Sequence, residues 1–330
     1  MLFSLLNVPP ASASTAAGSG SVGAPGAGAG LAAAGAPAAA RVPKRRPHVL
    51  REGAARALFG TAAALSIAAV ALICLFLLAN GVPAMAEIGL PEFLFGTTWR
   101  PANDLYGIFP MIVGSLYVTA GAMIVGVPGG LLTALYLSRF ARGRTGSFLR
   151  SGVELLAGIP SVVYGFFGLV IIVPFVRLLG PGTGLSVLAA SLILGIMILP
   201  TVITVAQSAL DAVPSRYYEG ALALGVDHEH AVFKVVAPAA ASGIMAAIVL
   251  GLGRAIGETM AVIMVAGNMP IIPDSLLSGV RTMTANIVLE MGYAADLHRE
   301  ALIATGVVLF VFILLITMLL NVTRKRGEAR

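Results

Sequence analysis

Charged residues are scarce in this sequence. Asp, Glu, Lys and Arg make up only 11% of the 330 residues, whereas hydrophobic residues make up 58% and the mean hydropathy is +0.95. A soluble domain carries roughly 25% charged residues, because its surface faces water. The composition therefore excludes an ordinary soluble enzyme and predicts a protein surrounded by membrane lipid. In a membrane protein, an excess of basic residues marks the segments on the cytoplasmic side. We therefore relate the net charge of +6 to membrane topology and expect no nucleic-acid partner.

Residues that carry metal, redox or nucleotide chemistry are also few. The single cysteine, Cys74, lies in an apolar run, which excludes a disulfide framework and a cysteine-based metal site. The four histidines are scattered, so we expect no metal and no cofactor on this chain. None of the three lysines follows a glycine, so the phosphate-binding GxxxxGK[ST] loop is missing. We predict that the chain is not an enzyme, and that another chain hydrolyses any ATP that drives it.

The N-terminal region differs from the rest of the chain. Residues 1–40 contain no charge and consist mostly of Ala, Gly, Pro and Ser, a composition that predicts disorder. The first residues lack the positive segment of a signal peptide, so we expect a retained tail. A basic cluster follows, which predicts a topology anchor. We therefore divide the chain into a cytoplasmic tail, 1–56, and a membrane domain, 57–330.

Six apolar stretches are long enough to cross a bilayer, which requires about 20 residues each. They lie at approximately 57–80, 112–138, 152–176, 185–210, 243–266 and 301–321. The sequence therefore predicts an all-α membrane protein with six transmembrane helices. Helix breakers inside these stretches, including Pro128, Pro160 and Pro200, predict kinked helices around a path, because the freed backbone groups need partners or water.

Lysine and arginine predict the orientation. With the N-terminus in the cytoplasm, 16 of these residues lie inside and four outside, while Arg254 lies within a span. Cytoplasmic segments carry the excess of positive charge, so we expect both termini in the cytoplasm.

The segment 251–262 (GLGRAIGETMAV) carries the first candidate site. Arg254 and Glu258 are four residues apart, so on one helix they share a face and can form an ion pair. Ionised groups inside a membrane are costly and usually functional, and an arginine fork suits phosphate or carboxylate oxygens. The spacing of Gly253 and Gly257 lets another helix approach closely. From the residues alone, the pair either handles a passing oxyanion or only locks two helices together.

The cytoplasmic segment 211–238 carries the second candidate site. Its pattern predicts helix, turn, helix, with Ser215 and Asp227 as N-caps and Gly225 in a left-handed turn. We expect His228 and His230 to be solvated. The segment is too long for a minimal connection, which indicates a docking surface.

This second segment resembles the EAA motif of ABC importer permeases. Glu219-Gly220-Ala221 is followed after three residues by Gly225, and Val235-Val236-Ala237-Pro238 closes the motif at the family spacing. The chain departs from the motif at Gly220, Val235 and Ala237. The resemblance implies that Glu219, Gly220, Ala221 and Gly225 belong to a coupling loop that docks into an ATP-binding subunit.

Three further segments, 96–116, 155–170 and 251–262, resemble the PstC-type permease of phosphate-specific Pst importers. The resemblance covers roughly residues 55–325 and implies a type I ABC importer permease fold in the bacterial inner membrane. It implies that Arg254 and Glu258 act in phosphate translocation. The partners it implies are a PstA-type permease as heterodimer, two ATP-binding subunits that use ATP and Mg, and an extracytoplasmic phosphate-binding protein.

Alternatives remain open from the sequence. The substrate is phosphate or another oxyanion such as molybdate or sulfate, because one arginine does not choose among tetrahedral oxyanions. An ion-coupled secondary transporter and a non-transporting scaffold are less consistent with the EAA-like loop. Trp99, Asp104 and Tyr106, in the first outer connection, either contact the binding protein or form an interfacial aromatic belt.

Overall fold

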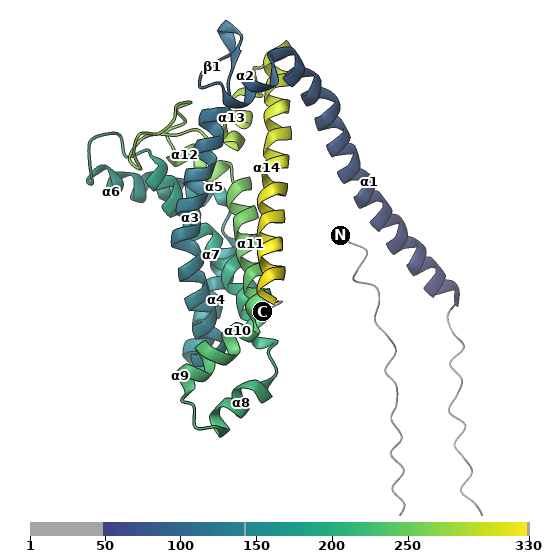
Figure 1. The fold of residues 1–330 in the computed structure, drawn as a ribbon, viewed down its shortest axis with the longest axis vertical. Helices are drawn as coiled ribbons and strands as arrows, with labels where there is room; N and C mark the ends of the chain where they lie inside the picture. The colour runs from purple at the N-terminus through teal and green to yellow at the C-terminus, as the bar shows by residue number, and fades with distance from the viewer. Residues whose placement is uncertain (1–48, 142, 329–330) are drawn as a thin grey trace, which may run out of the picture. The chain divides into compact units, whose positions relative to one another are not determined.

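The computed structural model describes residues 49–141 and 143–328 (Figure 1). The chain divides into two units at Leu58, and the architecture below is that of the second unit, which begins at Phe59. Most of the predicted N-terminal tail, residues 1–48, lies outside the described residues.

Four helices are individually long and apolar enough to cross a membrane. They are α1 (Val49–Ile88), α3 (Phe109–Leu135), α7 (Val187–Asp211) and α14 (Asp296–Glu328). The shorter helices are α2 (Leu90–Phe95), α4 (Gly143–Gly158), α5 (Ser161–Phe167), α6 (Val173–Arg177), α8 (Ser215–Ala223), α9 (His228–Ala231), α10 (Ala237–Ala239), α11 (Ala241–Gly257), α12 (Met260–Val265) and α13 (Met283–Glu290). Strands β1 (Trp99–Arg100) and β2 (Leu105–Tyr106) pair antiparallel, Trp99 opposite Tyr106. The all-α prediction is confirmed, and the described residues contain up to six spans if each of two bent helix pairs counts as one.

The third predicted span, 152–176, is not one straight helix. It is formed by α4 together with the following helices Ser161–Arg177, and the two parts are bent by 98°. Pro160 precedes α5 and has no N–H to continue the helix of α4. The predicted breaker at Pro160 therefore bends the chain by about a right angle, which is more than the expected kink.

Helix α7 is the centre of the bundle. Ser186 caps its start, where the hydroxyl accepts a hydrogen bond of 3.2 Å from the Ala189 amide. The apolar window of α7 is 67% buried, compared with 22% for α14. This fits a sequence that is apolar around most of the helix, since such a helix belongs inside a bundle. Helices α3 and α11 pack against it (Figure 1).

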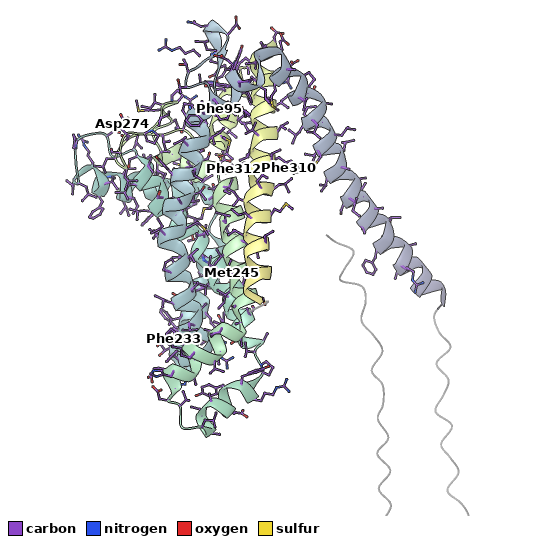
Figure 2. All side chains as sticks on the ribbon, in the orientation of Figure 1. Phe95, Phe233, Met245, Asp274, Phe310 and Phe312 are labelled. Carbon is purple, nitrogen blue, oxygen red and sulfur yellow. The ribbon has the colours of Figure 1, made fainter. Side chains whose placement is uncertain are left out.

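The two ends of the bundle differ. The β-hairpin lies at one end, whereas α8, α9 and α10 lie at the other (Figure 1). On α14, Phe312 packs into the core cluster near the hairpin end, whereas Phe310 is exposed (Figure 2). The exposed side of this span is therefore apolar, as expected for a helix that faces lipid.

Candidate functional site

Arg254 lies in the last turn of α11 and reaches across to α7. Its Nη1 donates a hydrogen bond of 2.9 Å to Oγ1 of Thr201. Thr201 directly follows Pro200, the proline inside α7. Arg254 is exposed on the surface of this chain although it lies within a predicted span. A neutral hydroxyl therefore holds the guanidinium near the middle of α7, and the other N–H groups of the guanidinium can donate to a ligand.

Glu258 does not pair with Arg254, so the ion pair that the four-residue spacing allows is not formed. Helix α11 ends at Gly257, and Glu258 has extended backbone angles (φ −71°, ψ 131°). Its Oε1 accepts a hydrogen bond of 3.1 Å from the Ala261 amide in the first turn of α12. Within the described residues no ion pair joins Arg254 and Glu258. The four-residue spacing implies a shared face only in a continuous helix, and this helix stops one residue too early.

The glycines of α11 have two different surroundings. A Cβ on Gly251 would meet Cγ2 of Val202 at 2.8 Å, so this glycine lets α11 approach α7 closely. A Cβ on Gly253 or Gly257 would meet nothing within 4 Å. The predicted close helix approach at Gly253 and Gly257 is therefore not made within this chain, and that face of α11 stays open.

The EAA-like segment folds as a short helical hairpin, α8 and α9. Gly225 has φ +85°, as the left-handed turn requires. Ala221 is 7% exposed and packs inward, whereas Glu219 and Gly220 are exposed. No hydrogen bond or ion pair within the described residues occupies the Glu219 carboxylate. Leu224, directly after α8, is an apolar residue that is 86% exposed.

Three details of this segment differ from the predicted helix caps and the predicted exposure of its histidines. Ser215 is the first residue of α8 and not its cap, because Pro214 occupies the N-cap position. Asp227 occupies the N-cap position of α9, but its side chain contacts Nδ1 of His230 at 2.7 Å and makes no cap. His228 is half-buried, because its ring packs against those of Phe140 and Tyr218, and its Nδ1 lies 2.8 Å from the Tyr218 hydroxyl. Only His230 is exposed as predicted.

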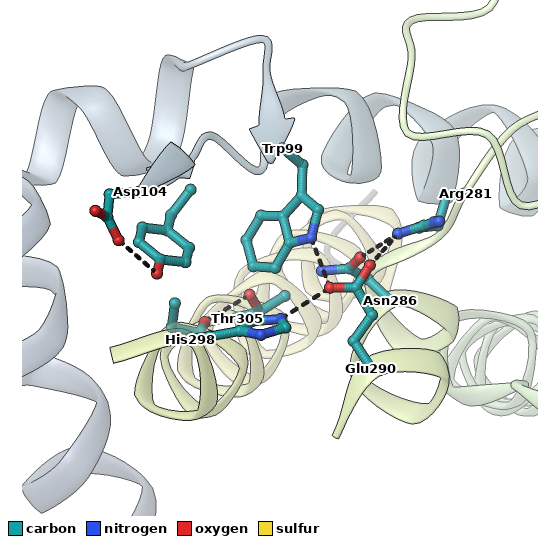
Figure 3. A network of polar contacts seen from close by, with 9 residues as sticks. Trp99, Asp104, Arg281, Asn286, Glu290, His298 and Thr305 are labelled. Carbon is teal, nitrogen blue, oxygen red and sulfur yellow. Dashed lines mark hydrogen bonds and ion pairs between the residues drawn. The ribbon is translucent and has the colours of Figure 1, made fainter. Parts of the chain in front are cut away.

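A buried polar cluster, which the sequence did not predict, lies at the hairpin end (Figure 3). Glu290, on α13, lies at its centre: Oε1 lies 2.6 Å from Nη1 of Arg281, and Oε2 accepts a hydrogen bond of 2.8 Å from Nε1 of Trp99. Nε2 of His298 lies 2.9 Å from Oε2. The signal in the sequence was the charge of Arg281 and Glu290 beside an apolar helix, but nothing linked either residue to Trp99.

The cluster changes the interpretation of the first outer connection. Trp99 is 5% exposed, so it is neither a docking residue nor part of an interfacial belt. Asp104 and Tyr106 line an open cavity of about 590 Å³ beside the cluster. Burial raises the pKa of the Tyr106 phenol, and the nearby charge of Asp104 raises it further. Tyr106 therefore stays protonated and donates to Asp104 Oδ1 at 3.3 Å.

Comparisons with known proteins extend these findings. The sequence profile of the family described as "Binding-protein-dependent transport system inner membrane component" matches residues 126–326. The chain is 37% identical over 289 residues to the probable ABC transporter permease protein YqgH of Bacillus subtilis, covering 84% of this chain and 94% of the relative. It is 33% identical over 279 residues to the phosphate transport system permease protein PstC of Mesorhizobium japonicum, covering 78% and 85%.

Solved structures show the same fold at low sequence identity. The MetNI methionine ABC transporter in an inward-facing conformation has a TM-score of 0.53 at 20% identity, covering 70% of this chain and 99% of that one. A bacterial ABC transporter that imports the acidic polysaccharide alginate has a TM-score of 0.55 at 14% identity, covering 84% and 99%. The predicted type I ABC importer permease fold is therefore confirmed.

Proposed function

Because the chain belongs to the family of binding-protein-dependent transport system inner membrane components, we propose that it is a permease subunit of an ATP-driven phosphate importer. The family consists of ABC transporter permeases, so this multi-pass chain of the bacterial inner membrane is not an enzyme, and the ATPase activity lies in separate subunits. The relatives named PstC, which are 32–33% identical over most of the chain, support phosphate as the substrate.

The observation that carries the proposal is the position of Arg254. An ionised group within a span is costly unless it faces a cavity, a partner or a ligand. Arg254 is bonded to a neutral hydroxyl and retains further donors. A guanidinium with free N–H groups binds the oxygens of a tetrahedral anion. Phosphate therefore passes Arg254 on its way inward, while Glu258 shapes the break between α11 and α12.

The proposed partners are supported by the family and by two exposed surfaces of the chain, one on α11 and one on the segment of α8 and α9. The open face at Gly253 and Gly257 receives a second, PstA-type permease, which completes the path as a heterodimer. The coupling loop docks into one of two ATP-binding subunits. Its exposed residues are Glu219, Gly220 and Leu224, while Gly225 forms the turn and Ala221 packs inward. These subunits use ATP and Mg. An extracytoplasmic phosphate-binding protein delivers the substrate at the hairpin end.

The proposed docking surface implies an orientation of the chain in the membrane. Helices α8 and α9 face the cytoplasm, where ATP is available, and α14 ends on the same side of the bundle (Figure 1). The end of α14 is then cytoplasmic, in agreement with the distribution of Lys and Arg, which predicts a cytoplasmic N-terminus as well. The coupling segment moves with the ATP-binding subunits and transmits that movement through α10 to α11, which carries Arg254.

Another oxyanion, such as molybdate or sulfate, is the second candidate, because a guanidinium binds each of these anions. The family assignment removes the secondary transporter and the scaffold from consideration. The test is ATP-dependent uptake of labelled phosphate into vesicles that contain the reconstituted complex, with arsenate, sulfate or molybdate in excess. Inhibition by arsenate alone supports phosphate. Uptake blocked by sulfate or molybdate, or uptake independent of ATP, contradicts the proposal.

A further inference from the structure

The exposed surface of α7 is polar, unlike that of the other long spans. All 25 residues of α7 are described, and only three of them are exposed: Thr204, Ser208 and Asp211. By contrast, α14 exposes Leu314 and Met318 to the exterior. Because lipid favours apolar side chains, the exposed strip of α7 faces water, a ligand or another protein chain.

The exposed polar residues of α7 continue along the helix to the residue that Arg254 contacts. Thr201, Thr204 and Ser208 follow the three- and four-residue spacing that places side chains on one helix face. We call these three residues the hydroxyl strip. At a rise of about 1.5 Å per residue, Thr201 lies about 15 Å from Asp211 at the end of α7, or half the thickness of a hydrocarbon core. The strip thus begins at the Arg254 contact and leads to the membrane surface.

Two of the three hydroxyls donate to backbone carbonyls of α7. Oγ1 of Thr204 donates to the Pro200 carbonyl at 2.8 Å, and Oγ of Ser208 donates to the Thr204 carbonyl at 2.8 Å. Thr201 accepts from Arg254, and among the described residues its own hydroxyl hydrogen has no acceptor. A hydroxyl hydrogen rotates freely, so each group can donate to an arriving anion and return to the backbone afterwards.

The charged residues around the hydroxyl strip are compatible with an anion that binds briefly and is then released. Arginines lie near both ends: Arg254 at Thr201, and Arg139 at the foot of α7, where its Nη2 donates to the Leu210 carbonyl at 2.6 Å. Asp211 is the only carboxylate of α7, and the hydroxyl of Ser138 donates a hydrogen bond to it. Arg150 also lies beside this stretch, because its guanidinium nitrogens are within 3.3 Å of the side-chain amide of Gln207. The exposed hydroxyls between the two ends are themselves neutral donors, and they bind an anion more weakly than a guanidinium does, which lets the anion move on.

We propose that Thr201, Thr204 and Ser208 line the inward half of the oxyanion path and pass the anion from Arg254 to the cytoplasm through successive hydroxyl hydrogen bonds. The inference rests on the proposed function and deepens it, because it assigns a route below Arg254. The competing occupant of the strip is a helix of the partner permease, packed through these small polar side chains.

The test uses the full complex in vesicles that contain ATP, with labelled phosphate supplied by the binding protein. The Thr204→Val/Ser208→Ala variant removes both exposed hydroxyls, and Thr204→Ser/Ser208→Thr keeps them while changing the shape. Controls are Ser66→Ala and Thr305→Val, because these hydroxyls also donate to the carbonyl four residues earlier but lie on α1 and α14.

We expect uptake to fall about tenfold or more in the hydroxyl-free variant, and less than about twofold in the hydroxyl-retaining variant and both controls. The amount of assembled complex and its ATP hydrolysis remain unchanged. Normal uptake by the hydroxyl-free variant would overturn the proposal. Equal losses of uptake in the hydroxyl-free and hydroxyl-retaining variants would also overturn it, since side-chain shape and not hydrogen-bond donation would then matter. Loss of assembly in both variants would overturn it as well, because the strip would then be a packing surface.

The single variant Ser208→Ala, which removes one oxygen atom, repeats the test with the least change in packing. The wild-type complex separates the two proposals. If it takes up no phosphate, the proposed function fails; if it does and every strip variant behaves as wild type, only the route is wrong.

Discussion

Arg254 and Thr201, 53 residues apart in the sequence, are joined by a hydrogen bond of 2.9 Å from a guanidinium to a hydroxyl. This contact connects the last turn of α11 with the residue after the proline of α7. It holds a permanent positive charge within the span without neutralising it, because a hydroxyl has no charge. Arg254 is therefore able to attract an anion, which an arginine already paired with a carboxylate does less well.

Arg254→Ala should abolish uptake and leave the complex assembled, because the side chain is exposed and its removal opens no core cavity. We expect a fall of about a hundredfold or more in phosphate uptake, as when one charged donor is removed from a preorganised site. Arg254→Lys, which keeps the charge without the fork, should retain part of the activity. Loss of the purified complex in both variants would instead indicate a structural role.

Glu258→Ala should destabilise the complex modestly, because the carboxylate caps the first turn of α12. The expected cost is about 1 kcal/mol, and Glu258→Gln, which keeps an acceptor oxygen, should cost less. A double-mutant cycle with Arg254→Ala, read by thermal unfolding, should give a coupling energy below about 0.5 kcal/mol. A much larger coupling energy would mean that the two side chains do pair in the assembled complex.

Glu219→Arg should break the association with the ATP-binding subunits, because it reverses the charge of an exposed and unpaired carboxylate. Co-purification of the ATP-binding subunit with the permease measures the effect. Asp274→Arg is the matched control, since Asp274 is also an exposed acid but lies toward the opposite end of the bundle (Figure 2). Unchanged assembly and ATP-driven uptake in Glu219→Arg would refute the coupling-loop assignment.

Gly225→Ala and Gly220→Ala should have different effects although both lie in the same segment. Gly225 has φ +85°, so an alanine there costs about 1 kcal/mol or more and distorts the turn. Gly220 lies inside α8 with nothing within 4 Å of an added Cβ, so alanine is tolerated and favours the helix. ATP hydrolysis stimulated by the binding protein should fall only in Gly225→Ala. Equal activities would show that the turn does not set the docking geometry.

Glu290→Ala should strongly destabilise the hairpin end, because it leaves Arg281 buried without its counter-charge. The side chains of Arg281 and Glu290 are only 15% and 9% exposed. Breaking a buried pair of this kind costs about 3–5 kcal/mol. Glu290→Gln keeps an acceptor for Trp99 and should cost less. The melting temperature of the purified complex reports both effects, and a melting temperature unchanged by Glu290→Ala would contradict a stabilising role.

The helical class and the two candidate segments follow from the sequence for a simple physical reason. A span requires a long apolar run, and a left-handed turn requires a residue such as Gly225, so both leave local signals. Tertiary partners leave no comparable signal. Trp99 was expected at a surface, yet it is buried against Glu290, which lies 191 residues later in the chain.

The sequence by itself determined that this chain is an apolar helical membrane protein, and that Arg254 lies within a predicted span and Glu219 in a connection between two spans. Only the tertiary structure decided which groups these side chains meet. The end of α11 at Gly257 separates Glu258 from Arg254, and the packing of α11 on α7 gives Arg254 a hydroxyl partner instead. The composition of a segment and the spacing of its residues are local properties, whereas the partner of a side chain depends on where distant helices cross.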